Sequence, residues 1–178
     1  LLLILPAVNA EAKEVSLVKG DAIRYMGYST HYYYVDGNLA FCLEPDMKSP
    51  GTGVYSASEL DPRSHLSKAM YYMYGGPGYE QYIKSSLTGG WGEDANAYCL
   101  THCVLSYIYD GCDQNSAAFK GLNADIASAV VMYADYVKNL PDIPDAELAF
   151  SENGLTAYYD REQKCQRTQS IRLVGDTA

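Results

Sequence analysis

The feature that most constrains this chain is the order of its local patterns, in which strand-like segments enclose a helix-like middle. Residues 14–44 and 147–174 are rich in β-branched and aromatic side chains, as is typical of strands. Residues 61–140 carry apolar side chains at helical spacing. We therefore expect an α+β protein, with a sheet or barrel-like lobe built from the N- and C-terminal strands and an inserted all-helical lobe.

Three helices are expected in the middle segment, over 65–74, 93–109 and about 123–140. The first follows Asp61-Pro62 and stops at the Gly-Gly-Pro-Gly run of 75–78, and Pro141 closes the third. The second places Leu100, Val104, Leu105 and Ile108 along one apolar face. On the N-terminal side, Asp36-Gly37-Asn38 predicts a turn into a strand that ends at Cys42, and the segment beyond Pro45 is expected to be a loop.

Composition narrows the class of protein. The 178 residues allow one domain with a proper core, and 48% apolar with 20% charged residues excludes wholesale disorder. The formal charge of −9, with thirteen scattered basic residues, argues against nucleic acid as a partner and against anionic lipid. Nothing after residue 10 is long and apolar enough to cross a bilayer, so we expect a soluble monomer without membrane insertion. Eighteen tyrosines against three phenylalanines indicate either a surface that makes contacts with a partner or a core that contains hydrogen-bonded hydroxyl groups.

Residues 1–10 resemble the end of a secretory signal peptide. An apolar run precedes Pro6 and a small-residue site, Val8-Asn9-Ala10, before the polar Glu11. Cleavage there would leave a mature, exported domain of residues 11–178. The competing interpretation is a buried N-terminal strand.

Five cysteines give an odd count, so in an exported chain at least one thiol stays outside any internal disulfide set. Cys99 and Cys103 lie one helical turn apart, where disulfide geometry is poor. We expect both to be small buried hydrophobic residues.

Three motifs resemble those of a known family. Ala-Phe-Cys-Leu-Glu-Pro at 40–45 is similar to the aromatic-Cys-hydrophobic motif that opens the Cys-Gln thioester domains of Gram-positive surface adhesins. The segments at 50–55 and 68–78 resemble those that follow that cysteine. Residues 101–106, Thr-His-Cys-Val-Leu-Ser, correspond to the family's central Thr-Gln helix motif, and its C-terminal glutamine motif falls within 163–171. The likeness runs from about residue 14 to the end.

The resemblance implies a secreted, wall-anchored domain at the cell surface that acts in adhesion. In such a domain Cys42 and a C-terminal glutamine form an internal thioester, which reacts with an amine, a lysine, on a host surface or matrix protein. The reaction happens once per molecule, so the domain is not an enzyme, and no cofactor is implied. A thioester survives only where water is kept away, and it forms only when both groups are held in contact.

The glutamine and the helix residues are less fixed by the pattern. Gln166 fits best because an apolar residue precedes it, with Gln169 and Gln163 as the next candidates; strand alternation puts those two on one face and Gln166 on the other. Thr101 is expected to orient a carbonyl or the helix. His102 stands where the family usually has glutamine, and it is either a general base near Cys42 or a packed structural residue.

Other functions remain open at this stage. A secreted cysteine hydrolase would use Cys42 as nucleophile and His102 as base, although Cys42 is expected in extended chain rather than at a helix N-terminus, where the dipole would activate it. A non-covalent binding module would use its tyrosine-rich surface. A zinc site at Cys42, Cys99, His102 and Cys103 lacks the usual ligand spacing.

Overall fold

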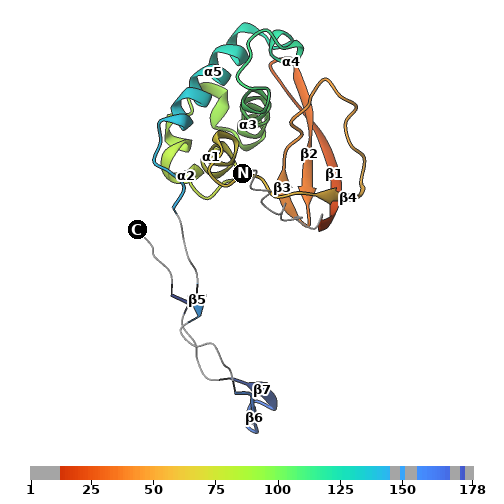
Figure 1. Cartoon of the computed structure of the whole chain (residues 1–178), viewed down its shortest axis with the longest axis vertical. Coiled ribbons are helices and arrows are strands. Elements are labelled where there is room, and N and C mark those ends of the chain that lie inside the picture. Colours follow the sequence, from red (N-terminus) through yellow and green to blue (C-terminus); the bar gives the residue numbers. More distant parts are fainter. Residues whose placement is uncertain (1–12, 145–148, 151–155, 169–172, 175–178) are drawn as a thin grey trace, which may run out of the picture. The chain divides into compact units, whose positions relative to one another are not determined.

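The computed structural model describes residues 13–144, 149–150, 156–168 and 173–174, and it divides into two units (Figure 1). The first unit ends at Pro141 and the second begins at Asp142. Unit 1 combines a four-stranded antiparallel sheet with a helical region, so the α+β class is confirmed. Residues 1–10, the expected signal segment, lie outside the described residues, and the mature domain of 11–178 stays a prediction.

The sheet of unit 1 has the strand order β3-β2-β1-β4. Its strands are β1 (Lys13–Tyr25), β2 (Tyr28–Val35), β3 (Asn38–Ala40) and β4 (Gly53–Ala57). Two-residue turns join the first three, Met26-Gly27 and Asp36-Gly37, and all four of these residues have positive φ. This is the conformation of the hairpin turns that match strand twist, and glycine at the second position adopts it without strain. The turn expected at Asp36 is confirmed.

β4 lies in the segment expected to be a loop. It pairs antiparallel with the first half of β1, with Val15 opposite Tyr55. Val54 and Tyr55 are exposed, as suits an edge strand. The expectation failed because the short strand follows a Pro-Gly-Thr-Gly run that reads as a turn signal, whereas the pairing comes from a partner about forty residues earlier.

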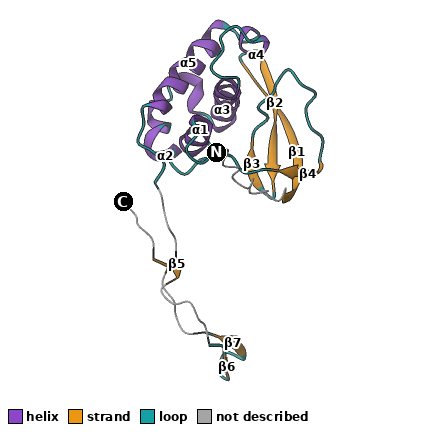
Figure 2. Ribbon diagram, in the orientation of Figure 1, coloured by secondary structure: helices purple, strands orange, loops and turns teal. Residues whose placement is uncertain are grey.

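The helices of unit 1 lie beside the sheet, and α3 lies between the sheet and the helices α1 and α5 (Figure 2). They are α1 (His65–Tyr72), α2 (Tyr79–Tyr82), α3 (Asp94–Tyr109), α4 (Ala117–Lys120) and α5 (Ala124–Lys138), with 3₁₀ turns η1 (Lys84–Ser86) and η2 (Gly89–Gly92). The three expected helices correspond to α1, α3 and α5. Side-chain caps start two of them, Ser64 before α1 and Asn123 before α5.

α3 is the core helix and is buried on almost every face. It contacts α1 and α5 on one side and β1 and β2 on the other, so residues 96–108 are all buried. The sequence predicted a single apolar face because Tyr, His, Ser and Thr occupy the remaining positions. Those polar side chains are buried with hydrogen-bond partners instead, as the next section describes.

Unit 2 consists of short paired strands. β5 (Ala149–Phe150) pairs with β8 (Leu173–Val174), and β6 (Tyr158–Asp160) pairs with β7 (Cys165–Arg167). Within the described ranges the sheet of β1–β4 contains no C-terminal strand, so the expected shared sheet is not among the observed pairings. No helix in the described part of the chain is long and apolar enough to span a membrane.

Candidate functional site

Cys42 lies two residues after β3, where the chain leaves the sheet. Its side chain is partly buried and its thiol is free, with Sγ 3.8 Å from the carbonyl oxygen of Glu44. Phe41 and Leu43, its two neighbours, pack against the core. The residues around Cys42 are not helical, so Cys42 does not stand at a helix N-terminus.

Two side chains of α3 hold the backbone on either side of Cys42. The Ser106 hydroxyl lies 3.0 Å from the carbonyl oxygen of Leu43 and 3.5 Å from that of Cys42. On the other side, the Tyr98 hydroxyl lies 2.8 Å from the carbonyl oxygen of Ala40, and its ring stacks on Phe41 with centroids 4.7 Å apart. The core helix therefore fixes the position of the cysteine through both flanking peptides.

Tyr98 also ties this segment to the sheet. Its hydroxyl lies 3.0 Å from the carbonyl oxygen of His31 and accepts a hydrogen bond from the backbone N–H of Tyr33 at 3.3 Å. The side chain is fully buried, and burial raises its pKa above the ordinary value, so the hydroxyl stays protonated and able to donate. The single hydroxyl proton of Tyr98 can be donated to only one carbonyl oxygen at a time, either that of Ala40 or that of His31.

Removing this hydroxyl should loosen the Cys42 segment measurably. We expect Tyr98→Phe to lower the free energy of unfolding by about 1–3 kcal/mol, because it leaves buried backbone groups without a partner. Tyr109→Phe, on the exposed end of the same helix, is the matched control and should change it by less than about 0.5 kcal/mol. Urea unfolding of both variants tests this, and equal stabilities would contradict the assignment.

His102 lies between Tyr98 and Ser106 on α3, and the spacing of four residues places all three on one helix face. Its Nδ1 is 2.8 Å from the hydroxyl of Tyr28, the first residue of β2. The side chain is only 2% exposed, and burial lowers the pKa of His102 to about 4. The imidazole is therefore neutral near pH 7, and Tyr28 occupies one of its two nitrogens.

Acid should destabilise the fold through His102. In the unfolded chain His102 has the ordinary pKa of about 6.5. Between pH 6.5 and about 4 the imidazole is therefore protonated in the unfolded state and neutral in the folded state. Stability is then full above pH 6.5 and falls as pH drops toward 4, by on the order of 3 kcal/mol. His102→Gln should flatten this fall while His31→Gln keeps it. Denaturant midpoints measured across this pH range test it, and parallel curves for wild type and His102→Gln would contradict it.

The Tyr28 hydroxyl, hydrogen-bonded to His102 of α3, is a buried group whose pKa the nearby cysteines affect. Burial, and then the neighbouring Cys103, Cys42 and Cys99, raise the pKa of Tyr28 well above its ordinary value. Burial also raises the pKa of Cys103 to about 12 and that of Cys99 to about 11. Both thiols are free and buried, as expected, and a protonated buried thiol is a poor nucleophile.

Thr101 is fully buried and serves a different segment. Its Oγ1 accepts a hydrogen bond from the backbone N–H of Tyr74 at 3.2 Å. Tyr74 opens the glycine-rich loop that follows α1, so Thr101 joins that loop to α3. The expected role of Thr101 in orienting a carbonyl or the helix stays a prediction.

The candidate glutamines belong to unit 2. Gln166 is an exposed residue of β7, paired with Tyr159 of β6. Gln163 is in the turn before β7, where its backbone N–H donates to the Asp160 carboxylate at 3.0 Å. It is therefore not a strand residue, and the alternation argument does not apply to it. Gln169 lies outside the described residues. Which glutamine meets Cys42 stays a prediction.

The side chains around Cys42 and α3 do not form a metal site in the part of the chain that the structure describes. Among the residues that the structure describes, no group of three His, Cys, Asp or Glu side chains could hold a metal ion. The zinc alternative at Cys42, Cys99, His102 and Cys103 therefore has no support. Its physical obstacle is that burial keeps two of the thiols protonated while Tyr28 takes one of the two histidine nitrogens, Nδ1.

The residues that sequence reasoning missed are Tyr28, Tyr98 and Ser106. Tyr98, His102 and Ser106 recur every four residues within an apolar helix, and this polar stripe was the available signal. Tyr28 carried no such signal, because its role depends on where β2 meets α3.

The fold and the site together define an α+β unit in which the core helix α3 holds the segment of a free cysteine. Residues 14–144 match the family model described as a thioester domain. The match covers well over half of the 178 residues, and the chain belongs to the thioester domain family. The matched range includes Cys42, Thr101 and His102 and ends before Gln163. Neither the comparison with curated proteins nor that with solved structures finds a match.

Proposed function

We propose that this domain forms an internal thioester between Cys42 and Gln166 and uses it to bind an amine covalently on a surface ligand. The observation that carries the proposal is the placement of Cys42. Its thiol is free, it lies within the family match, and α3 holds the peptides on both sides of it. A reaction between two side chains of one chain is fast only when both groups are held in position, and a fixed sulfur supplies one of them.

The bond-forming step exchanges ammonia for sulfur. The Cys42 sulfur attacks the side-chain carbonyl carbon of Gln166, the carbon–nitrogen bond breaks, and ammonia leaves with the thiol proton. In the capture step a ligand amine attacks the same carbon. The carbon–sulfur bond then breaks, and the sulfur takes the proton that the amine loses. Cys42 ends as a free thiol and the acyl group of Gln166 as an amide.

This chemistry gives a reagent that acts once, not an enzyme. The glutamine nitrogen is not restored, so each molecule captures one ligand. A lysine side chain is the amine that a protein ligand presents. By family likeness we expect a secreted domain displayed on the wall of a Gram-positive cell, a monomer, and a host surface or matrix protein as the ligand.

Intact mass spectrometry of the purified domain tests the proposal. We expect a mass lower than the sequence mass by one ammonia, and methylamine should raise it by the mass of one methylamine. Gln166→Ala should lose both effects, whereas Gln163→Ala and Gln169→Ala should keep them. Full sequence mass without methylamine uptake would contradict the proposal. Peptide cleavage sensitive to Cys42 alkylation would then favour a hydrolase, and ligand binding without cleavage a non-covalent module.

A further inference from the structure

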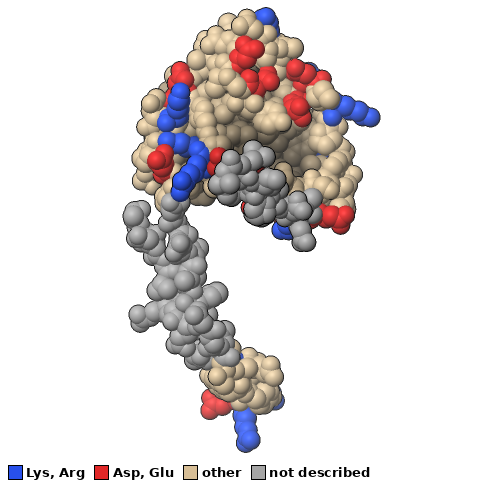
Figure 3. All heavy atoms as spheres, viewed as in Figure 1, with Lys and Arg blue, Asp and Glu red and all other residues tan. Residues whose placement is uncertain are grey.

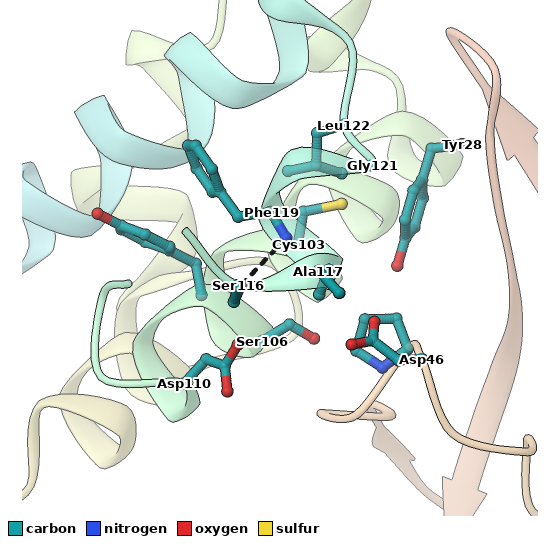
Figure 4. Close-up of a pocket in the computed structure, with 13 residues that line it drawn as sticks. Tyr28, Asp46, Cys103, Ser106, Asp110, Ser116, Ala117, Phe119, Gly121 and Leu122 are labelled. Carbon is teal, nitrogen blue, oxygen red and sulfur yellow. Dashed lines mark hydrogen bonds between the residues drawn. The ribbon is translucent and has the colours of Figure 1, made fainter. Parts of the chain in front are cut away.

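A pocket of about 170 Å³ lies beside the Cys42 segment (Figure 4). Its walls come from α3, from α4, from β2 and from the chain just after Cys42. One water molecule needs roughly 15 Å³ measured in this way, so the pocket has room for a side chain of several heavy atoms. The site described above does not use this space.

The pocket shares residues with the cysteine site. Ser106 lines it and also donates to the carbonyl of Leu43, and Tyr28 lines it and is hydrogen-bonded to His102 of the same helix. Pro45 and Asp46, which follow Cys42 closely in the chain, form another part of the wall. A molecule in this pocket therefore lies next to the segment that carries the reactive sulfur.

The lining has two kinds of surface. Tyr107, Phe119 and Leu122 give an apolar wall, in which the rings of Tyr107 and Phe119 lie 5.0 Å apart. Asp46 and Asp110 add two exposed carboxylates, and none of the described residues that line the pocket is lysine, arginine or histidine. Figure 3 shows acidic side chains above the hollow on the viewed face of unit 1, with a basic side chain to its right. An apolar wall with negative charge at its rim fits a cationic group on an apolar stem.

We propose that this pocket binds the side chain of a lysine on the ligand, with its methylene stem against Phe119 and Leu122 and its ammonium group drawn in by Asp46 and Asp110. The inference rests on the proposed thioester and adds the subsite that selects the amine. Binding there brings the nitrogen to the Cys42 segment. The ammonium loses one proton to solvent before its neutral form attacks the thioester carbon, and the sulfur takes the second proton as it leaves.

Selectivity among simple amines tests the pocket. Pentylamine mimics the lysine stem and methylamine lacks it, so wild-type domain should take up pentylamine about tenfold faster at equal concentration and pH. Ala117→Leu, an exposed position of α4 that Figure 4 shows among the lining residues, should remove that preference. Ala124→Leu, an exposed alanine of α5 outside the lining, should keep it. Equal rates for the two amines in wild type, or an unchanged preference in Ala117→Leu, would overturn the proposal.

Charge gives a second selectivity test. Asp46→Asn should slow pentylamine uptake several-fold at low salt, with less effect in concentrated salt, because the carboxylate acts at a distance. Asp21→Asn, an exposed carboxylate of β1 outside the lining, is the control. Equal slowing by both substitutions would argue against a charged rim at this pocket.

Reversible binding separates this inference from the proposed function. In Cys42→Ala, which has no thioester, pentylammonium should still shift the NMR signals of Phe119 and Leu122, and Ala117→Leu in that background should suppress the shifts. Absence of shifts overturns the pocket even where methylamine uptake proves the thioester. Shifts in Cys42→Ala, together with full sequence mass for the wild-type domain, would uphold the pocket and refute the thioester.

Discussion

Cys42→Ala is expected to abolish covalent amine uptake completely, because the proposed thioester is built on the sulfur of Cys42. Cys99 and Cys103 are buried and their pKa values are raised to about 11 and about 12, so their thiolates are scarce near neutral pH. Cys42 is only partly buried and its side chain makes one weak contact, to the carbonyl of Glu44. The variant should therefore fold, and the loss of uptake should report chemistry rather than unfolding.

The matched control is Cys112→Ala, which removes an exposed thiol far along the chain. It should take up a biotinylated amine to the same extent as wild type, one per molecule. The readout is the fraction of protein labelled, with a thermal melt of each variant beside it. Labelling of Cys42→Ala at the wild-type level would show that the electrophile lies elsewhere.

Gly76→Ala should give the largest loss of stability of any single-methyl change considered for unit 1. A Cβ at this position would overlap the carbonyl oxygens of Met70 and Tyr71, which are backbone atoms of α1 and cannot turn aside. The glycine-rich loop after α1 must stay close to that helix, because N–H groups of the loop donate hydrogen bonds to carbonyl groups at the helix C-terminal end. The N–H of Gly76 donates to the carbonyl of Met73, and that of Gly78 to the carbonyl of Tyr71.

The expected cost is about 3 kcal/mol or more, since the overlap can be relieved only by moving the loop. Such a shift would also strain the bond from the N–H of Tyr74 to Thr101 and so reach α3. Gly51→Ala is the control, because nothing lies within 4 Å of a Cβ there. It should change stability by less than about 0.5 kcal/mol. Similar unfolding midpoints for the two variants would contradict the close packing of this loop.

Local signals were enough to predict the three longest helices and one hairpin turn. Apolar spacing and proline or glycine stops located α1, α3 and α5 to within about two residues, and Asp36-Gly37 marked a hairpin turn. One expectation failed because of a partner distant in the chain, and another because of a local hydrogen bond. β4 was missed because its strand character comes from pairing with β1. The expected strand from Gln163 was shortened because the Asp160 carboxylate folds that residue into a turn.

The candidate site was predictable in part. The motif around Cys42 identified the cysteine, and residues 101–106 pointed to α3. The sequence did not identify Tyr98 and Ser106 as the groups that hold Cys42, because their partners are backbone carbonyls, which carry no residue-specific pattern. The environment of His102 was also not predictable from the sequence. Its contact with Tyr28 depends on the packing of β2 on α3, and no local sequence pattern indicates it.

Peptide mapping of the untreated domain tests the central claim most directly. Digestion at mildly acidic pH, without added amine, preserves a thioester for mass spectrometry. The account predicts one cross-linked species, the peptide containing Cys42 joined to the peptide containing Gln166 with loss of one ammonia, which separates on addition of hydroxylamine. Recovery of both peptides at full mass, with Cys42 freely alkylated in the native protein, would contradict it.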